Sequence, residues 1–377
     1  MILQKSNIES RTVYTFFDEE ERVVVHPSLY LRNLRNRNRP ITSQRQVAHV
    51  VKLHCQWIEN SASFEDMSVD QALAVIDDED ILDWINKQRT EGGVSESTIN
   101  NRELLVRGMY RWLTTSDSGH IRHDIPWTEG TFTKQSNEKA PRFVTPEQTI
   151  KLLSGMHNES QRVASHFIYD TGVRISELVR LRRSCLPDED SWPKDVNYYP
   201  LMVSGSKPRR GHKVKKRYTI LSRPVLARVR RYHSSRQYIP ARDWSVFDPE
   251  KPLFLNVQGK PLTEDSLRKT IRSAWRRNNI SSDYERMGPH RLRHGCGMSV
   301  LLSEFGSDLI DNLVILKEML GHEKIQTTEI YASIPIAALQ SIQGERKVTV
   351  RFEDANRIYQ ATYLPPRLHA EKRGHRT

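Results

Sequence analysis

The chain has 377 residues, of which 58 are Lys or Arg and 46 are Asp or Glu, and its formal net charge is +12. Hydrophobic residues make up 37% of the chain, and no apolar run approaches the roughly 20 residues that span a bilayer, which excludes a membrane-spanning protein. The positive charge favours a polyanionic partner, and nucleic acid is the usual one.

The cysteines and the N-terminus indicate the compartment. Cys55, Cys185 and Cys296 lie far apart and form no C-x-x-C pair, so they fit reduced thiols better than a disulfide framework or a zinc site. The N-terminal residues, MILQKSNIES, lack the apolar stretch of a signal peptide. We therefore expect a cytoplasmic protein.

Residues 1–42 are expected to form an N-terminal extension. Two β-like runs, RTVYTFF at 11–17 and RVVV at 22–25, flank an acidic DEEE and predict a small β-hairpin. The stretch 32–45 that follows holds five arginines and no acid, and it predicts a basic linker.

A compact helical domain is expected over residues 43–115, where apolar residues recur at three- and four-residue spacing. Ser95 and Ser97 are candidate N-caps for its last helix. Arg102 and Arg107 occupy polar positions of that helix. They either contact phosphates or remain solvated, and the pattern favours neither.

The next boundary is a linker. Gly, Pro, Ser and Asn without any period mark residues 116–142. A second domain, 143–343, begins with Thr145 as an N-cap and Pro146 as the first helical residue. Helical patterns continue through this domain, and residues 344–377 form a basic tail.

One β-hairpin interrupts the second domain. LMVSG at 201–205 and RYTIL at 217–221 predict its strands, and seven of the eleven residues 207–217 are Lys or Arg. A lysine with a pKa lowered by cationic neighbours can protonate a departing alkoxide, and the pattern does not choose among four candidates. These candidates are Lys207, Lys213, Lys215 and Lys216. Most of them, together with Arg209 and Arg210, are expected to contact phosphates.

A further group follows the turn in YDTGVRISELVRL, residues 169–181. Arg174 is expected at the start of a helix, off the apolar stripe, where its planar guanidinium matches two phosphate oxygens. Glu177, one turn later, would hold that guanidinium in place. A plain surface Arg–Glu pair is the alternative when the two residues are taken alone.

The segment GPHRLRHGCG, residues 288–297, places His290 and Arg293 on one face of a helix. The pair combines a proton acceptor near neutrality with a permanent cation for a phosphate. His294, four residues after His290, raises a zinc interpretation. No acidic residue surrounds these histidines from 286 to 300, so phosphate binding is favoured over a metal site.

The last group is LGHEKIQTTEIYA, residues 320–332. Gly321 is expected to cap a helix, leaving His322 in the connecting turn, with Tyr331 nine residues further on. A tyrosine hydroxyl becomes a nucleophile only where a base accepts its proton and cations stabilise the charge that develops on a phosphate. The arginines, histidines and lysines above supply those groups.

Taken together, these segments resemble the tyrosine recombinase (phage integrase) family. TGVRISELVRL is similar to its first arginine motif, HRLRH to its His-x-x-Arg motif, LGH to its third motif and TTEIYA to its nucleophile motif. The order and separations fit: 116 residues from Arg174 to His290, 29 from Arg293 to His322, and nine more to Tyr331.

The same resemblance covers about residues 143–343 and, more weakly, 43–115. VSGSK is similar to the family's catalytic-lysine turn, which favours Lys207 over the other lysines. The implied catalytic residues are Arg174, Lys207, His290, Arg293, His322 and the nucleophile Tyr331, with Glu177 behind Arg174.

The resemblance implies a mainly α fold with a small β-sheet or hairpin. A helical core-binding (SAM-like) domain and an α+β catalytic domain would form a C-shaped clamp on double-stranded DNA. The implied assembly is a homo-oligomer, a tetramer on DNA, with accessory DNA-bending or partner recombinase proteins. The C-terminal segment would dock on a neighbouring subunit, with VTVRF at 348–352 as an added strand.

The activity implied is site-specific DNA recombination through a 3′-phosphotyrosyl intermediate, with neither a metal nor ATP as cofactor. The expected setting is integration, excision or transposition of a mobile element, with the protein on the nucleoid when bound to DNA; resolution of replicon multimers is less favoured. Three alternatives stay open: a type IB topoisomerase-like enzyme, a DNA-binding regulator without catalysis, and a metal-dependent nuclease using His290 and His294.

Overall fold

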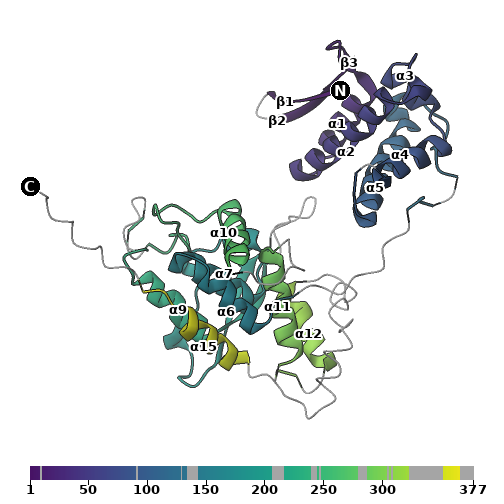
Figure 1. Ribbon diagram of the computed structural model, residues 1–377. Helices are drawn as coiled ribbons and strands as arrows, with labels where there is room; N and C mark the ends of the chain where they lie inside the picture. Colours follow the sequence, from purple (N-terminus) through teal and green to yellow (C-terminus); the bar gives the residue numbers. More distant parts are fainter. Residues whose placement is uncertain are drawn as a thin grey trace, which may run out of the picture. The chain divides into compact units, whose positions relative to one another are not determined.

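The computed structural model describes residues 1–8, 11–90, 92–128, 130–133, 143–205, 216–238, 244–245, 248–278, 287–303, 305–306, 309–321 and 351–365 (Figure 1). The chain divides into two compact units, Met1–Lys139 and Ala140–Thr377. In each unit helices predominate over a small antiparallel sheet, which confirms the predicted fold class. None of the described helices is long and apolar enough to cross a bilayer.

The first unit joins a three-stranded antiparallel sheet to a group of helices. The strands are β1 (Ile2–Ile8), β2 (Arg11–Phe17) and β3 (Val23–Val24), in the order β1-β2-β3. The helices are α1 (Val25–Asn36), α2 (Ile41–Glu59), α3 (Val69–Val75), α4 (Asp78–Thr90) and α5 (Glu96–Leu113), with 3-10 turns at Ala62–Phe64 and Ser116–Ser118.

The N-terminal part differs from the sequence prediction in two ways. β2 does pair with β3, but its main partner is β1. The β1 sequence, ILQKSNI, is too polar in the middle to predict a strand. The arginine-rich stretch 32–45 lies mostly in α1 and α2 instead of a linker. The physical reason is that Tyr30 and Leu31 bury one face of α1, which holds the neighbouring arginines in the helix.

The core of the first unit is rich in aromatic rings. The His54 ring stacks on Trp57, meets Trp84 edge-on, and its Nε2 lies 2.9 Å from the Tyr110 hydroxyl. Complete burial lowers the pKa of His54 to about 3, because an imidazolium would lose its hydration there.

Residues beyond α5 extend this core. Glu103 of α5 is fully buried and accepts hydrogen bonds from Trp127 Nε1 at 2.9 Å, the Phe132 amide at 2.6 Å, and the Thr133 amide at 3.0 Å and hydroxyl. The region predicted as a linker, 116–142, therefore packs on the first unit as far as Thr133.

The second unit is built around α7, which contacts α6, α9, α11 and α15 (Figure 1). Its helices are α6 (Pro146–Ser154), α7 (Glu159–Thr171), α8 (Ile175–Leu178), α9 (Arg223–His233), α10 (Glu264–Arg277), α11 (Pro289–Leu301), α12 (Leu309–Leu320) and α15 (Arg351–Thr362). The strands are β4 (Tyr198–Ser204) and β5 (Lys216–Ser222), and 3-10 turns lie at Arg183–Cys185 and Glu189–Ser191.

The local predictions for this unit are confirmed where they depend on caps and alternation. The Thr145 side chain accepts from the Gln148 amide while the Gln148 side chain accepts from the Thr145 amide, and Pro146 begins α6. β4 and β5 pair as antiparallel strands and bury Val203 and Leu221 against the core.

The C-terminal part requires a correction. VTVRF was predicted as an added strand, yet Arg351 and Phe352 begin helix α15. Buried Ala355, Ile358 and Tyr359 give this segment an amphipathic helical period, and it packs on α6, α7 and α9 of its own unit.

Buried ion pairs contact and stabilise both ends of α15. Arg351 pairs with the carboxylate of Asp170 at 3.7 Å. At the other end, Arg228 pairs with Glu159 at 2.6 Å and donates to the carbonyl and hydroxyl oxygens of Thr362 at 3.1 and 2.8 Å.

Candidate active site

The site begins at the turn between α7 and α8. Gly172 ends α7 with a left-handed φ of 63°, and Arg174 is the N-cap of α8. The Arg174 amide donates to Glu177 Oε2 at 2.8 Å, and its Nη1 donates to Glu177 Oε1 at 3.0 Å. The Glu177 side chain is fully buried, whereas that of Arg174 is 37% exposed, so the carboxylate holds the guanidinium while part of it still faces outward.

Arg293 contacts the same turn from α11. It is buried on α11, its Nη1 donates to the Gly172 carbonyl, and its Nη2 donates to the Leu320 carbonyl at 2.7 Å. One guanidinium therefore joins the end of α7 to the end of α12, where Gly321 has a φ of 64°. The predicted glycine cap of that helix is confirmed.

His290 lies one turn before Arg293 on α11 and is exposed. Partial desolvation, reinforced by the positive charges of Arg293 and Arg174, lowers the pKa of His290. The lowered pKa favours the neutral imidazole at neutral pH, which is the form that accepts a proton. Its ring meets that of His294 edge-on at 4.3 Å between centroids.

Arg217 completes the described part of the site, although in the sequence it is only one member of a basic run. Its side chain is 9% exposed, its Nη2 donates to Glu177 Oε2 at 2.8 Å, and its Nη1 donates to the Met319 carbonyl. A signal existed in the sequence. Arg217 shares the inward face of β5 with Thr219 and Leu221, and an inward-facing arginine requires an acidic or carbonyl partner.

The predicted residues are therefore brought together only in part. Arg174, Glu177, His290 and Arg293 lie at one site, and Lys216 is an exposed residue at the start of β5. The following predictions lie outside the described residues: Lys207, Arg209, Arg210, Lys213, Lys215, His322 and Tyr331. Within the described part of the chain, no three His, Cys, Asp or Glu side chains gather as metal ligands.

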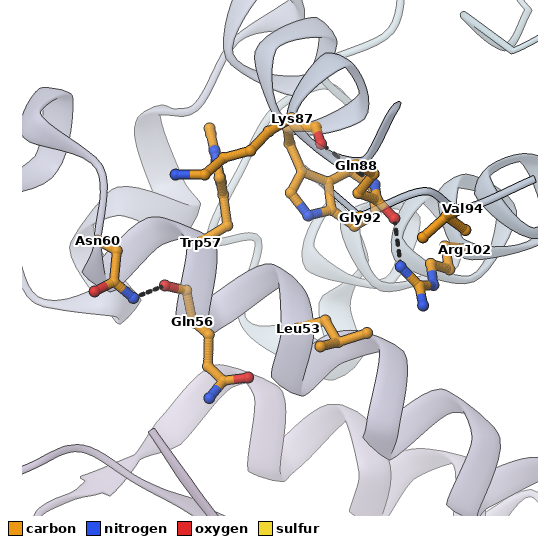
Figure 2. A pocket seen from close by; sticks show the side chains of 10 residues that line it. Leu53, Gln56, Trp57, Asn60, Lys87, Gln88, Gly92, Val94 and Arg102 are labelled. Carbon is orange, nitrogen blue, oxygen red and sulfur yellow. Dashed lines mark hydrogen bonds between the residues drawn. The ribbon is translucent and has the colours of Figure 1, made fainter. Parts of the chain in front are cut away.

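Arg102 and Arg107 lie in the first unit. Arg102 donates to Gln88 Oε1 at 2.9 Å and lines a pocket of about 440 Å³ beside Trp57 and Lys87 (Figure 2). The guanidinium carbon of Arg107 lies 5.8 Å from the centroid of the Trp127 ring. Both side chains are half-buried, so each combines a local contact with partial exposure.

The described site thus holds a buried carboxylate shared by two guanidiniums, a buried third arginine and a histidine with a lowered pKa, an arrangement suited to binding a phosphate. The model of the phage integrase family matches residues 142–335. That match spans just over half of the chain, so the chain belongs to the phage integrase family. It is a tyrosine recombinase, a DNA-binding enzyme that cleaves and rejoins DNA through a tyrosine intermediate in site-specific recombination.

Individual proteins agree with this assignment. The chain is 27% identical to tyrosine recombinase XerC of Halalkalibacterium halodurans over 66% of this chain and 75% of that protein. It is 22% identical to XerC of Thermodesulfovibrio yellowstonii over 78% of this chain and 88% of that one.

Two solved structures share the fold. XerH recombinase bound to a palindromic difH substrate has a TM-score of 0.60 at 18% identity, with 85% of this chain and 84% of that chain covered. The Tn1549 transposon integrase, residues 82–397 with circular intermediate DNA, has a TM-score of 0.59 at 16% identity, with 85% and 99% covered.

Proposed function

We propose that Tyr331 attacks a DNA phosphodiester, forming a 3′-phosphotyrosyl bond and releasing a 5′-hydroxyl. That hydroxyl, or one from a partner strand, then attacks the phosphotyrosine and releases the tyrosine. Each step exchanges one phosphoester for another, so the bond energy is kept and neither ATP nor a metal is needed. The observation that carries this proposal is the joint placement of Arg174 and Arg293 around the Gly172 turn.

The supporting residues take distinct roles. Arg174 and Arg293 bind the non-bridging oxygens through the pentavalent transition state, with Glu177 orienting Arg174. His290 accepts the proton of Tyr331, a role that its lowered pKa supports. Loss of one arginine is expected to lower the cleavage rate by on the order of 10²–10³, as for other preorganised donors to a developing anion.

Two groups outside the described residues complete the proposal. His322 donates a hydrogen bond to the phosphate, and Lys207 protonates the 5′-oxygen as it leaves. A 5′-bridging sulfur needs no proton, so it should restore cleavage by Lys207→Ala. Restoration of Lys213→Ala or Lys216→Ala instead would move the general acid to that lysine.

DNA binding is proposed to use both units. Arg102 and Arg107 would contact phosphates from the first unit, and the basic hairpin would do so from the second. The hairpin residues are Arg209, Arg210, Lys213, Lys215 and Lys216. Phosphate contacts of this kind make affinity depend strongly on salt.

Strand exchange between two duplexes uses four active sites, so we propose a tetramer on DNA, aided by DNA-bending or partner recombinase proteins. We propose integration, excision or transposition of a mobile element as the setting. The fold likeness to the Tn1549 transposon integrase and the N-terminal segment that carries β1–β3 and α1 support that setting. Resolution of replicon multimers is the second candidate.

The test is covalent capture. A nicked duplex is selected from a randomised pool by its attachment to the wild-type protein in EDTA, and the adduct is resolved on a denaturing gel. The adduct should vanish in Tyr331→Phe with DNA binding retained, and persist in the matched control Tyr363→Phe. Cleavage that requires a metal and leaves no adduct would refute the proposal, and paired sites would separate recombination from simple relaxation of supercoils.

A further inference from the structure

Arg217 lies where three parts of the active site meet. It begins the inward face of β5, directly after the basic hairpin, and is paired across the sheet with Val203. Its Nη2 contacts Glu177, the partner of Arg174, and its Nη1 contacts the Met319 carbonyl in the last turn of α12. These contacts join segments that lie 40 and 102 residues from Arg217 along the chain.

We propose that Arg217 is a positioning residue for DNA cleavage: it fixes Glu177, and through it Arg174, in one geometry relative to the hairpin and the end of α12. The inference rests on the proposed role of Arg174 at the scissile phosphate. Arg217 does not touch the phosphate itself.

The first argument is electrostatic. Glu177 is fully buried and accepts from the Arg174 amide, the Arg174 guanidinium and the Arg217 guanidinium. If Glu177 paired with Arg174 alone, its negative charge would cancel the positive charge of Arg174, which is proposed to bind the phosphate. Arg217 supplies a second guanidinium, so the three side chains keep one net positive charge beside the buried Arg293.

The second argument is geometric. A β-carbon at Gly321 would clash with Cδ of Arg217, and Gly321 also has a left-handed φ of 64° that favours glycine. The Arg217 side chain therefore lies directly against the residue that precedes His322. A shift of this side chain would change the position of Arg174 and of the α12 terminus together.

The variants are Arg217→Gln and Arg217→Lys, with Arg223→Gln as the matched control. Arg223 follows the same strand and donates to the Lys194 carbonyl at 2.9 Å, away from Glu177. On the captured nicked duplex, single-turnover cleavage by Arg217→Gln should fall about 10–100-fold, the range seen when partners that orient metal ligands are removed. DNA binding should change no more than in Arg223→Gln, since both lose one positive charge.

Cleavage of a substrate with a methylphosphonate at the scissile position distinguishes a positioning role from a merely structural one. It replaces a charged non-bridging oxygen with a methyl group, so a well-placed arginine clamp has less charge to stabilise. Arg217→Gln and Arg174→Gln should therefore be slow on the phosphate but close to wild type on the methylphosphonate. Equal losses on both substrates would overturn the inference.

These experiments distinguish failure of the role proposed for Arg217 from failure of the proposed cleavage by Tyr331. Absence of a wild-type adduct, or an adduct in Tyr331→Phe, refutes the proposed function. A normal wild-type adduct, with Arg217→Gln cleaving like Arg223→Gln, refutes only the role of Arg217. If Arg217→Gln does not fold, Arg217→Lys makes the same comparison, because one amine cannot reproduce both guanidinium contacts. Equal loss by Arg217→Lys on both substrates again overturns the inference.

Discussion

Glu103→Ala should destabilise the first unit more than any surface substitution on the same helix. The carboxylate receives four hydrogen bonds, from Trp127, Phe132 and twice from Thr133. At about 1.5–3 kcal/mol for a bond to a charged group, the four sum to roughly 6–12 kcal/mol. Residues 127–133 can instead detach and regain water, which limits the cost, so we expect a loss of about 3–5 kcal/mol.

Calorimetry of the full chain measures this effect, with one transition expected for each unit. The transition of the first unit should fall by roughly 10–20 °C and that of the second should stay in place. Glu103→Gln keeps one carbonyl oxygen and should lose about half as much. The control is Glu96→Ala at the exposed N-terminal end of the same helix, where little change is expected. An unshifted first transition in Glu103→Ala would refute the packing of 127–133 as a stabilising contact.

Three further predictions follow from buried and titrating groups. The lowered pKa of His290 places the acid limb of the cleavage rate below pH 6.5, and His290→Ala should remove that limb; a limb unchanged by the substitution would exclude His290 as the base. His54 has a pKa near 3 when folded, so the unfolded state binds more protons below pH 6.5. The first unit should therefore lose stability from pH 6.5 towards pH 4, and His54→Gln should flatten that dependence in calorimetric scans. Arg351→Met leaves the buried Asp170 carboxylate without its cationic partner and should cost about 3–5 kcal/mol in the second transition. Partial recovery is expected in the Asp170→Asn double variant, and no recovery would argue against the ion pair.

Features that depend on a few neighbouring residues could be predicted from the sequence. The capping box at Thr145 and the helical face shared by His290 and Arg293 need no knowledge of distant contacts. Arg174 and Glu177 were also predictable as a pair, since they are separated by one helical turn.

Features fixed by distant contacts could not be predicted in this way. β1 forms because β2 pairs with it along its whole length, although the residues in the middle of β1 are polar. Arg217 acquires its role from Glu177 and Met319, which are far away in the sequence. Segment 351–362 is a helix because its buried side chains meet α6, α7 and α9.

The contacts at the C-terminal end of α15 determine where a stable fragment of the second unit can end. The family pattern stops at residue 335, but the Arg228–Glu159 pair is completed by Thr362 and by the Leu364 amide, which donates to Glu159 at 2.9 Å. A fragment that ended at residue 335 would lack the contacts of Thr362 and Leu364 with this buried ion pair. It would also leave Asp170 without Arg351. We therefore expect a stable fragment of the second unit to extend at least through Leu364, beyond residue 335, where the family match ends.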